Sequence, residues 1–400
     1  MEFELYEGRQ VEEKFFKLIQ NVEIFAPESL GYKNVLIAGD KIVSISDRME
    51  IPVDIEKVQV IDGEGNYLVP GFIDAHVHML GGGGGAGYGS RAPELQATEA
   101  FLAGTTTIVG SLGIDTVTRT PMMLLAKARS LQQRNLSVYI VVGGFQLPPD
   151  TICGGDLRKD MFIIPEMLGV GEPAVSDARS NKPSQEYLMA LVSEIHNAGR
   201  VSGKRGVVQF HLGDAPSGIQ PLLDLLPNVP IKHILPLHFN RNEQLMEEAP
   251  LWAEKGGYVD LTSPLSPPQH KRGVVVPEAV KILKEKGVDP KLITVSTDGN
   301  GVSTLFGLAQ IERFPLNLLH KDFKTMVSDM RIDLAEALGY VSTNISDALG
   351  IADRKGRIKV GLDADMVVLD RKTLDVRTVF SVGHLVVSQG DRVNKARLDG

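Results

Sequence analysis

Hydrophobic and polar positions alternate in a regular rhythm through the middle of the chain, from about residue 70 to residue 349. Short apolar runs are followed by amphipathic segments at intervals of ~25–45 residues, the pattern of strands that alternate with helices. Continuous apolar runs are typical of strands covered on both faces. The eight candidate strands are Gly71–His76, Thr105–Ser111, Ser137–Gly143, Met167–Gly171, Gly206–His211, Ile231–His238, Gly257–Leu261 and Leu292–Thr297. Eight such units close naturally into a barrel, so the sequence predicts an α/β protein with a (β/α)8 TIM barrel.

The two ends of the chain have a different pattern, in which Gly, Pro and Asp separate short β-type segments, as in hairpins. The candidate segments are Val22–Phe25, Lys33–Ile37, Lys41–Ile45, Val58–Asp62, Ile358–Leu369, Val376–Val382 and His384–Val387. Neither end is large enough for a stable core of its own. We therefore predict that residues 1–69 plus 350–400 form one small β-sandwich domain, and that residues 70–349 form the barrel.

Composition and charge narrow the class of protein. The chain has 400 residues, a net charge of −8 and positive charges that are scattered along it, which argues against nucleic acid or an anionic membrane as a partner. The single cysteine, Cys153, allows no internal disulfide and fits a reducing compartment. The N-terminus has no secretory signal pattern, and no stretch approaches the ~20 apolar residues that a bilayer requires. A soluble cytoplasmic protein is expected.

Four of the nine histidines lie where candidate strands end. His76 and His78 are two positions apart, and because side chains on a strand alternate, both point the same way. His211 ends the fifth strand, His238 ends the sixth, and Asp298 follows the eighth. The C-terminal ends of barrel strands meet on the face where barrel enzymes carry their sites. We therefore expect these five side chains to converge.

Imidazole and carboxylate ligands suit Zn²⁺, with Mn, Fe or Co as alternatives. Any one of these histidines could simply form hydrogen bonds in a polar pocket, but four together with Asp298 favour a site for one or two divalent metals. A bound metal lowers the pKa of its water to ~7, which makes hydroxide available at neutral pH. We interpret the other histidines as ordinary hydrogen-bonding side chains, namely His196, His233, His270, His320 and His384.

Several motifs resemble a known family. Val69–His78, which reads VPGFIDAHVH, is similar to the first-strand motif of the amidohydrolase superfamily, and Gly361–Asp365 is similar to that family's return to its small β-domain. Further segments resemble isoaspartyl (β-aspartyl) dipeptidases, and these are Gly81–Gly84, Ser90–Glu94, Leu125–Lys127, Ser176–Ser180, Phe210–Asp214, Asn240–Asn242 and Ser296–Gly301. The resemblance extends from about residue 20 to residue 390, and it implies a hydrolase with the barrel architecture predicted above.

The resemblance implies five metal ligands, which are His76, His78, His211, His238 and Asp298. In isoaspartyl dipeptidases a carboxylated lysine on the fourth strand bridges two metals, and the matching position in this chain holds Glu172. A glutamate also offers a bridging carboxylate, so we expect Glu172 to be a ligand. The alternative is a glutamate that binds no metal.

The resemblance also implies a mechanism, in which metal-bound hydroxide attacks an amide carbonyl and Asp298 serves as general base and then as general acid. Arg179 and Arg241 match arginines that bind substrate carboxylates, a task that suits a bidentate guanidinium. Gly83 matches a substrate-binding position in the glycine run. The alternatives are structural ion pairs for the two arginines and a flexible loop for the glycines. The expected partner is a small substrate with a carboxylate, and the family resemblance implies a homo-oligomer.

Four positions depart from the pattern of the dipeptidases, and they are Gly85, Phe145, Ile114 and Val302. They stand, in that order, where the family has a glutamate for the substrate α-amino group, a tyrosine that polarises the scissile carbonyl, a substrate-binding threonine and a serine. Tyr88 or Gln146 could replace the lost phenol. A missing carboxylate leaves a substrate ammonium without a partner. The departures favour an acidic substrate without a free amine, such as an N-acylated or cyclic amide.

Two other functions remain open from the sequence. One is a cyclic amidase or lactonase that resembles dihydroorotases and hydantoinases. The other is a non-catalytic paralogue that keeps the barrel to bind a ligand. Five intact ligand positions argue against the second alternative, because a site without catalytic function should lose its ligands first.

Overall fold

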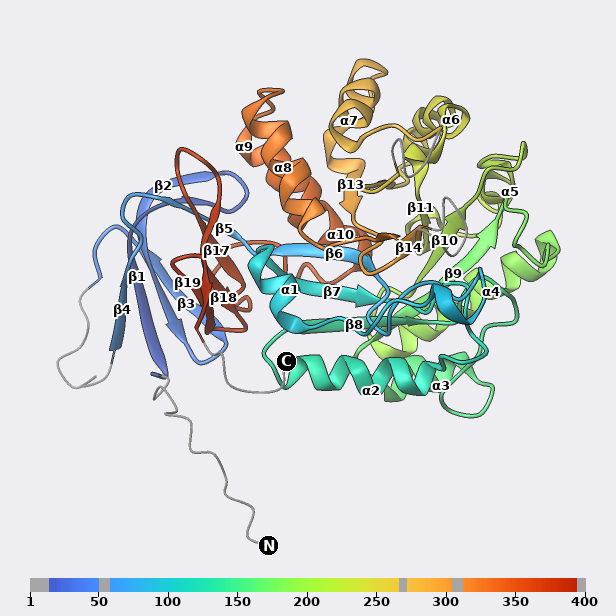
Figure 1. Cartoon of the computed structure of the whole chain (residues 1–400), viewed down its shortest axis with the longest axis horizontal. Coiled ribbons are helices and arrows are strands. Elements are labelled where there is room, and N and C mark those ends of the chain that lie inside the picture. Colours follow the sequence, from blue (N-terminus) through green and yellow to red (C-terminus); the bar gives the residue numbers. More distant parts are fainter. Residues whose placement is uncertain (1–13, 50–57, 266–271, 304–311, 394–400) are drawn as a thin grey trace, which may run out of the picture.

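The computed structural model describes residues 14–49, 58–265, 272–303 and 312–393. His270 lies outside these residues. Within them, a barrel lies beside a smaller β-sheet, on the left in Figure 1. No helix within the described residues is long and apolar enough to cross a membrane.

The barrel contains eight parallel strands. Six form one hydrogen-bonded sheet in the order β11-β10-β9-β8-β7-β6, and β12 pairs with β13. The strands are β6 (Phe72–Val77), β7 (Thr105–Gly110), β8 (Ser137–Val142), β9 (Met167–Val175), β10 (Val207–Leu212), β11 (Ile234–Leu237), β12 (Val259–Thr262) and β13 (Ile293–Ser296). The ring closes where the Gly299 amide donates to His76 O at 3.1 Å and the His78 amide donates to Gly299 O at 2.7 Å. The side chain of Asn240 joins β11 to β12, since it bonds both the amide and the carbonyl of Thr262.

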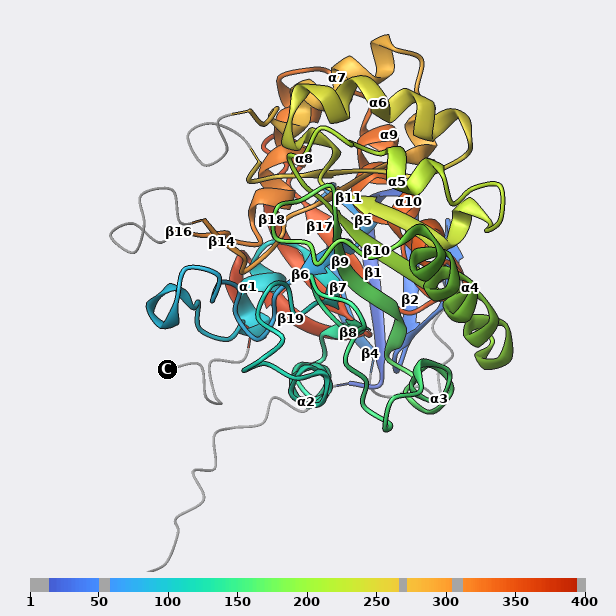
Figure 2. The same cartoon turned by 90° about the vertical axis from the view of Figure 1, so that its right-hand side faces the viewer.

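Helices surround these strands, as Figure 2 shows in a view toward the barrel end. They are α1 (Ala97–Leu102), α2 (Pro121–Gln132), α3 (Leu157–Ile163), α4 (Gln185–Ser202), α5 (Gln220–Leu223), α6 (Glu243–Glu254), α7 (Val276–Glu285), α8 (Leu318–Ser328), α9 (Leu334–Leu338) and α10 (Asn344–Leu349). Capping residues set the ends of these helices, as α4 shows. The hydroxyl of Ser184 caps the N-terminus of α4, and Gly203 ends this helix in the left-handed conformation that glycine favours.

Every residue of β6, β7, β9 and β10 is buried, because helices cover the outside of the barrel and side chains fill its inside. The predicted (β/α)8 barrel with a small β-domain is confirmed. Its eight strands lie where the apolar runs indicated, with ends shifted by a few residues. The largest shift is at the fourth strand, where β9 continues to Val175 instead of ending at Gly171, and at the sixth strand Ile231–His233 forms a short 3-10 turn ahead of β11.

The small domain is one nine-stranded sheet built from both ends of the chain, in the order β20-β19-β18-β17-β5-β1-β2-β3 with β4 beside β1. Its strands are β1 (Phe16–Phe25), β2 (Ser29–Ala38), β3 (Lys41–Ser46), β4 (Val58–Asp62), β5 (Tyr67–Pro70), β17 (Met366–Leu369), β18 (Val376–Ser381), β19 (His384–Ser388) and β20 (Asp391–Arg392). The N-terminal and C-terminal strands share one core, in which Ile24 and Ile37 pack with Met366 and Phe380. The two ends therefore stabilise each other. The exact domain boundaries at residues 69 and 350 stay a prediction.

Two predictions for the small domain are wrong in detail. β4 does not form a hairpin with its neighbour in sequence, because it pairs in parallel with β1. The predicted strand Ile358–Leu369 is a strand only from Met366 onward. Residues 358–365 instead contact β3 only through an isolated bridge between Lys41 and Asp363 and the backbone bonds beside it, while the side chains of Asp363 and Asp365 bind a buried ammonium.

That buried ammonium belongs to Lys355, which joins the barrel to the small sheet. Its Nζ lies 2.8 Å from Asp363 Oδ2, 2.5 Å from Asp365 Oδ2 and 2.6 Å from the hydroxyl of Ser137 at the start of β8. Lys355 is only 3% exposed. The contact lies at the N-terminal end of the strands, so it supports the fold at the end of the barrel away from the strand C-termini.

We predict that Lys355→Met destabilises the protein by about 3–5 kcal/mol, because the buried carboxylate of Asp365 would lose its cation, whereas Asp363 would keep Lys41 and Arg354. Urea unfolding followed by circular dichroism measures the change. Lys359→Met, an exposed position on the same segment, is the control and should be close to neutral. Equal stability of both variants would contradict a structural role for the Lys355 contact.

Candidate metal centre

The side chains predicted to bind metal come from five strands and meet at the C-terminal end of the barrel. His76 lies in β6 and His78 just beyond it, while Glu172 lies in β9 and His211 in β10. His238 and Asp298 follow β11 and β13 directly, with φ angles of 72° and 49°. A left-handed backbone at a residue other than glycine costs ~1–3 kcal/mol. The surrounding structure holds these two residues in sharp turns that aim their side chains at the centre.

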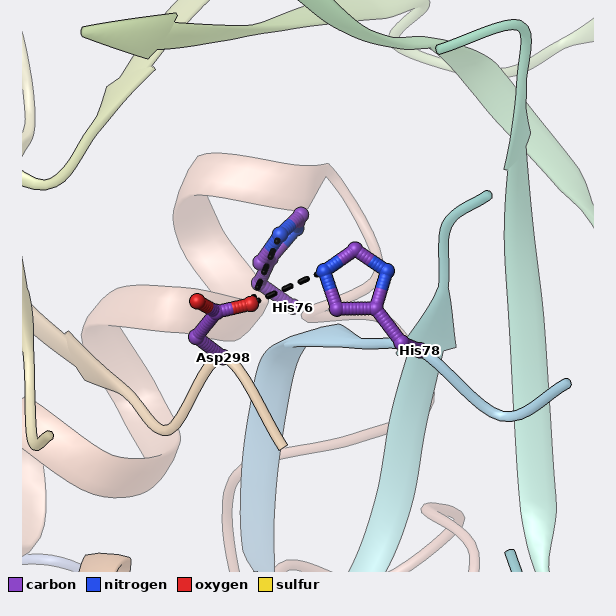
Figure 3. A group of neighbouring side chains, drawn as sticks. All are labelled: His76, His78 and Asp298. Atoms are coloured by element: carbon purple, nitrogen blue, oxygen red, sulfur yellow. Dashed lines mark ion pairs between the residues drawn. The ribbon is translucent and has the colours of Figure 1, made fainter. Parts of the chain in front are cut away.

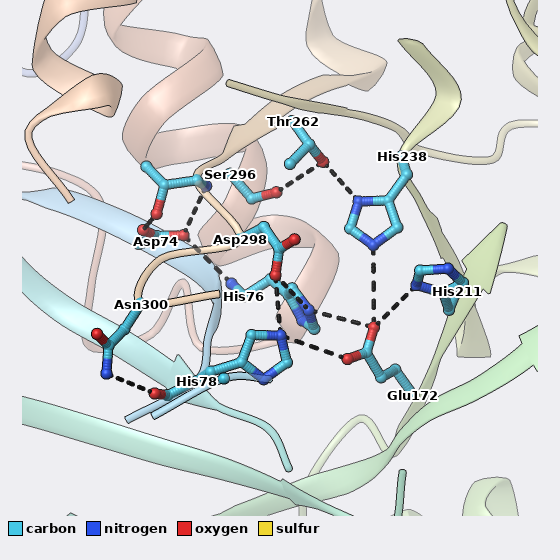
Figure 4. Close-up of polar contacts among 12 residues, drawn as sticks. Asp74, His76, His78, Glu172, His211, His238, Thr262, Ser296, Asp298 and Asn300 are labelled. Carbon is cyan, nitrogen blue, oxygen red and sulfur yellow. Dashed lines mark hydrogen bonds and ion pairs between the residues drawn. The ribbon is translucent and has the colours of Figure 1, made fainter. Parts of the chain in front are cut away.

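Glu172 lies in the middle of the group and is 1% exposed. Its Oε2 is 3.2 Å from His76 Nε2, 3.3 Å from His211 Nδ1 and 3.8 Å from His238 Nε2. Its Oε1 is 3.6 Å from His78 Nε2. Figure 4 shows the carboxylate between the four rings. One oxygen of this carboxylate thus faces three of the rings, and the other oxygen faces the fourth.

Asp298 completes the group from the opposite side. Its Oδ1 lies 2.8 Å from His78 Nε2 and 3.6 Å from His76 Nε2, and Figure 3 shows both rings turned toward the same oxygen. Two sets of three ligand atoms each lie within 4.8 Å of one another. One set is His76, His78 and Asp298, and the other is His76, Glu172 and His238.

Several atoms that face the centre have no hydrogen-bond partner although they are buried. They are Nε2 of His76, Nδ1 of His211, Oε2 of Glu172 and Oδ1 of Asp298. Buried polar atoms without partners are rare in native proteins, and each calls for an explanation. A cation between these nitrogen and oxygen atoms satisfies most of them together. The residues present therefore fit a centre for one or two divalent metals.

The protonation of the histidines is shaped by the same burial. Burial alone would lower the pKa of His76, but the carboxylates of Glu172, Asp298 and Asp260 raise it to about 9. Burial lowers the pKa of His238 to about 3 despite its contact with Glu172. Glu172 is buried, which by itself would raise its pKa, yet the imidazoles hold the pKa well below the ordinary value. The centre therefore offers an ionised carboxylate and at least one neutral imidazole at neutral pH.

A second layer of polar residues orients His238. Its Nδ1 lies 2.9 Å from the hydroxyl of Thr262, which in turn contacts Ser296 and Asp260. Ser296 donates to Asp260 Oδ2 at 2.8 Å. Burial raises the pKa of Asp260 to about 7. With a hydrogen bond at Nδ1, the ring presents Nε2 toward Glu172, which is the usual device that orients a metal-binding histidine.

The sequence did not predict these polar residues behind the metal-binding side chains. Thr262 and Asp260 lie in β12, and Asp74 lies in β6, where it accepts bonds from the amide and hydroxyl of Thr297. Burial raises the pKa of Asp74 to about 6. The available signal was an acidic residue inside an otherwise apolar strand. Such a residue must find partners within the barrel, but the sequence does not say which.

The predicted substrate-binding arginines lie beside His211. Arg179 Nη2 and Arg241 Nη2 are 2.9 Å and 3.3 Å from His211 Nε2. Arg179 also forms a two-point ion pair with Asp177, at 2.9 and 2.7 Å. Burial and the charge of Arg179 lower the pKa of Arg241, and Arg241 Nη1 lies 3.8 Å from Asp214 Oδ2. Two guanidinium groups at one wall make that wall attractive to an anion.

A cavity of about 320 Å³ opens above the centre. Gly83 lines it, as predicted for the glycine run, and has a φ of +88° with the Ser90 carbonyl oxygen 1.8 Å from where a Cβ would lie. Only glycine fits there. The four positions at which the chain departs from the dipeptidase pattern also line this cavity, and they are Gly85, Ile114, Phe145 and Val302.

Other predicted positions have structural roles. His233 Nδ1 lies 2.8 Å from Gly206 O, and His196 stacks on His233 with ring centroids 4.2 Å apart. His320 Nε2 lies 2.8 Å from Leu374 O. Gln146 donates to Arg179 O at 2.6 Å, and Tyr88 is 88% exposed and does not line the cavity. Neither of the last two side chains replaces the phenol that Phe145 lacks in this arrangement.

Comparisons with known proteins agree with this architecture. A sequence model described as the amidohydrolase family matches residues 228–392. The β-aspartyl dipeptidase of Fervidobacterium islandicum AW-1, solved with β-Asp-Leu, is 32% identical with a TM-score of 0.88, over 96% of this chain and 100% of that chain. The dihydropyrimidinase of Brevibacillus agri NCHU1002 is 17% identical with a TM-score of 0.65, over 94% and 96% of the two chains. A dihydroorotase of Elusimicrobium minutum is 22% identical over 88% of each chain.

We predict that Glu172→Gln weakens metal binding at least tenfold and lowers the number of metal ions retained per chain, because an amide is a poor substitute for a bridging carboxylate. Elemental analysis after dialysis and titration calorimetry of the metal-free protein measure both quantities. Glu285→Gln, at an exposed position on α7, is the matched control. Unchanged metal content in Glu172→Gln would exclude Glu172 as a ligand.

Proposed function

The chain belongs to the amidohydrolase superfamily, and from this premise we propose that it is a metal-dependent hydrolase of an amide bond in a small molecule that carries a carboxylate. The observation that carries the proposal is a set of buried ligand atoms without hydrogen-bond partners, beside two arginines, at the floor of one cavity. In this respect the chain is similar to an isoaspartyl dipeptidase, but its substrate pocket differs.

We assign the metal-holding roles as follows. His76, His78 and Asp298 would hold one cation, His211 and His238 would hold a second, and Glu172 would contact both. A bound divalent cation supplies a water of lowered pKa, ~7, and polarises a carbonyl oxygen. Zn²⁺ suits this mixture of nitrogen and oxygen ligands, and Mn, Fe or Co are alternatives.

Asp298 is the proposed general base and acid. Its side chain is 17% exposed and lines the cavity, whereas Glu172 is almost completely covered. Burial would raise the pKa of Asp298, but the hydrogen bond and charge of His78 hold it below the ordinary value. The carboxylate is therefore ionised at neutral pH. It can accept a proton from the attacking water and then give that proton to the leaving amine.

The arginines position the substrate in this proposal. A carboxylate that pairs with Arg241 and Arg179 would lie against His211, at the edge of the centre. This anchor fixes one end of the molecule, so the amide can lie over the metal-binding groups. Gly83 adds a backbone wall that lets the substrate approach closely.

A second candidate is hydrolysis of a cyclic amide. A cyclic amide with a carboxylate would also pair with the arginines, and it would present no free ammonium to the cavity. Assays with dihydroorotate and hydantoins, beside linear amides, distinguish the two functions. A protein that retains no Zn²⁺ or Mn²⁺ after careful loading would instead favour a non-catalytic ligand-binding role.

We predict that Asp298→Asn lowers kcat about 10²–10⁴-fold, because the proton acceptor is lost. The fold should be kept, since asparagine tolerates the left-handed backbone at this position. Steady-state kinetics are measured at saturating metal, and circular dichroism together with metal analysis measures how much structure and metal the variant keeps, so that a loss of kcat is compared at equal metal content. Native-like turnover by a variant with full metal content would remove Asp298 from the chemistry.

We predict that Arg241→Met lowers kcat/KM for acidic substrates about 10–100-fold, the worth of a charge-assisted hydrogen bond. A substrate whose carboxylate is converted to an amide should be affected much less, and this comparison is the internal control. Arg200→Met, at an exposed position on α4, controls for the loss of one positive charge. An equal loss on the acidic and the neutral substrate would argue against carboxylate binding by Arg241.

A further inference from the structure

Charge is unevenly distributed over the walls of the cavity. Arg179 and Arg241 supply positive charge at the wall beside His211, and the ring of Phe145 lies 4.8 Å below the guanidinium of Arg179. Most of the remaining lining is glycine backbone and apolar side chains, among them Ile114, Leu265, Val302 and Phe314, and Ser90 and Ser303 also contribute to it. A Cβ at Gly85 would lie 3.1 Å from Ile114 Cδ1, so this part of the glycine loop lies against the Ile114 side chain.

Among the described residues that line the cavity, Glu172 and Asp298 are the only carboxylates, and both face the imidazoles. Three other acids lie near the lining, and one of them, Asp214, has its Oδ2 3.8 Å from Arg241 Nη1. Asp177 forms the two-point pair with Arg179. Asp115 accepts from the amide and hydroxyl of Thr118 and from Arg91. The sequences of residues 266–271 and 304–311, which follow the lining residues Leu265 and Ser303, contain no Asp or Glu.

A free α-ammonium group brings three donors and a positive charge. In this cavity it would lose water, meet no carboxylate to pair with, and lie in the field of two guanidinium groups and any bound metal. An acyl group or a ring closure at the same nitrogen removes the charge, and its carbon atoms suit the apolar wall. The cavity therefore disfavours a substrate with a free ammonium because it offers that group no carboxylate, and it favours an acidic substrate because it offers two arginines.

We propose that the substrate is an acidic amide whose amino group is blocked, either N-acylated or closed into a ring, and that free-amine dipeptides are rejected. This inference rests on the proposed amidohydrolase function. It names a specificity-determining surface, the apolar wall formed by Gly85, Ile114, Leu265, Val302 and Phe314.

The test uses a matched pair of substrates, β-Asp-Leu and N-acetyl-β-Asp-Leu, which share the scissile bond and both carboxylates and differ only in the ammonium. We expect the metal-loaded protein to hydrolyse the acetylated compound with a kcat/KM at least tenfold higher, equivalent to about 1.4 kcal/mol. A lactam formed from the same amino group is assayed in parallel, to separate acylated from cyclic substrates.

Ile114→Asp places a carboxylate on the apolar wall, and Ile114→Asn is its uncharged control of the same size. The aspartate variant should raise the ratio of activity on β-Asp-Leu to activity on N-acetyl-β-Asp-Leu at least tenfold, and the asparagine variant should not. Circular dichroism and metal analysis verify that both variants are folded and loaded.

Equal or faster hydrolysis of β-Asp-Leu by the unmodified protein would overturn the inference while leaving the hydrolase proposal intact. If neither compound nor the lactam is hydrolysed, the amide-hydrolase proposal fails. In that case the binding affinities of the two linear compounds, measured by calorimetry, decide the inference. Tighter binding of the acetylated compound supports the blocked-amine pocket, and tighter binding of β-Asp-Leu overturns it.

Discussion

The placement of one carboxylate, that of Glu172, among four imidazoles is the constraint on which the rest of the site depends. A buried negative charge is costly unless it is paired, and here its partners come from β6, β10 and the end of β11. The C-terminal ends of those strands must therefore lie at the same level along the barrel axis. The closed barrel meets this requirement, because every strand contributes its C-terminal end to one face.

Much of this arrangement could be predicted from the sequence. The apolar runs located all eight strands, since parallel strands covered on both faces leave few polar positions inside them. Polar residues at the ends of such runs must lie at the C-terminal face of the barrel, where the strand ends meet. This placement singled out His76, His78, His211, His238 and Asp298. The structure brings these five residues and Glu172 together. Their roles as ligands remain a prediction.

The features that could not be predicted depend on contacts between distant segments. Thr262 orients His238 across two strands, and nothing in either local sequence pairs them. Residues 358–365 have the alternation of a strand, but they meet β3 only at an isolated bridge, and the pairing of Asp363 and Asp365 with the distant Lys355 side chain has no signal in the local pattern. The close contact of Arg179 and Arg241 with His211 likewise depends on the loops after β9 and β11 meeting in space.

The left-handed backbone of His238 and Asp298 has a consequence for how this protein can change over time. Glycine adopts this conformation at lower free energy than either residue, so a change to glycine at one of these positions would relax the turn and at the same time remove a proposed metal-binding side chain. A higher melting temperature in such a variant would therefore not indicate a higher activity. A relative with a relaxed turn at either position is expected to have a higher melting temperature and a lower activity.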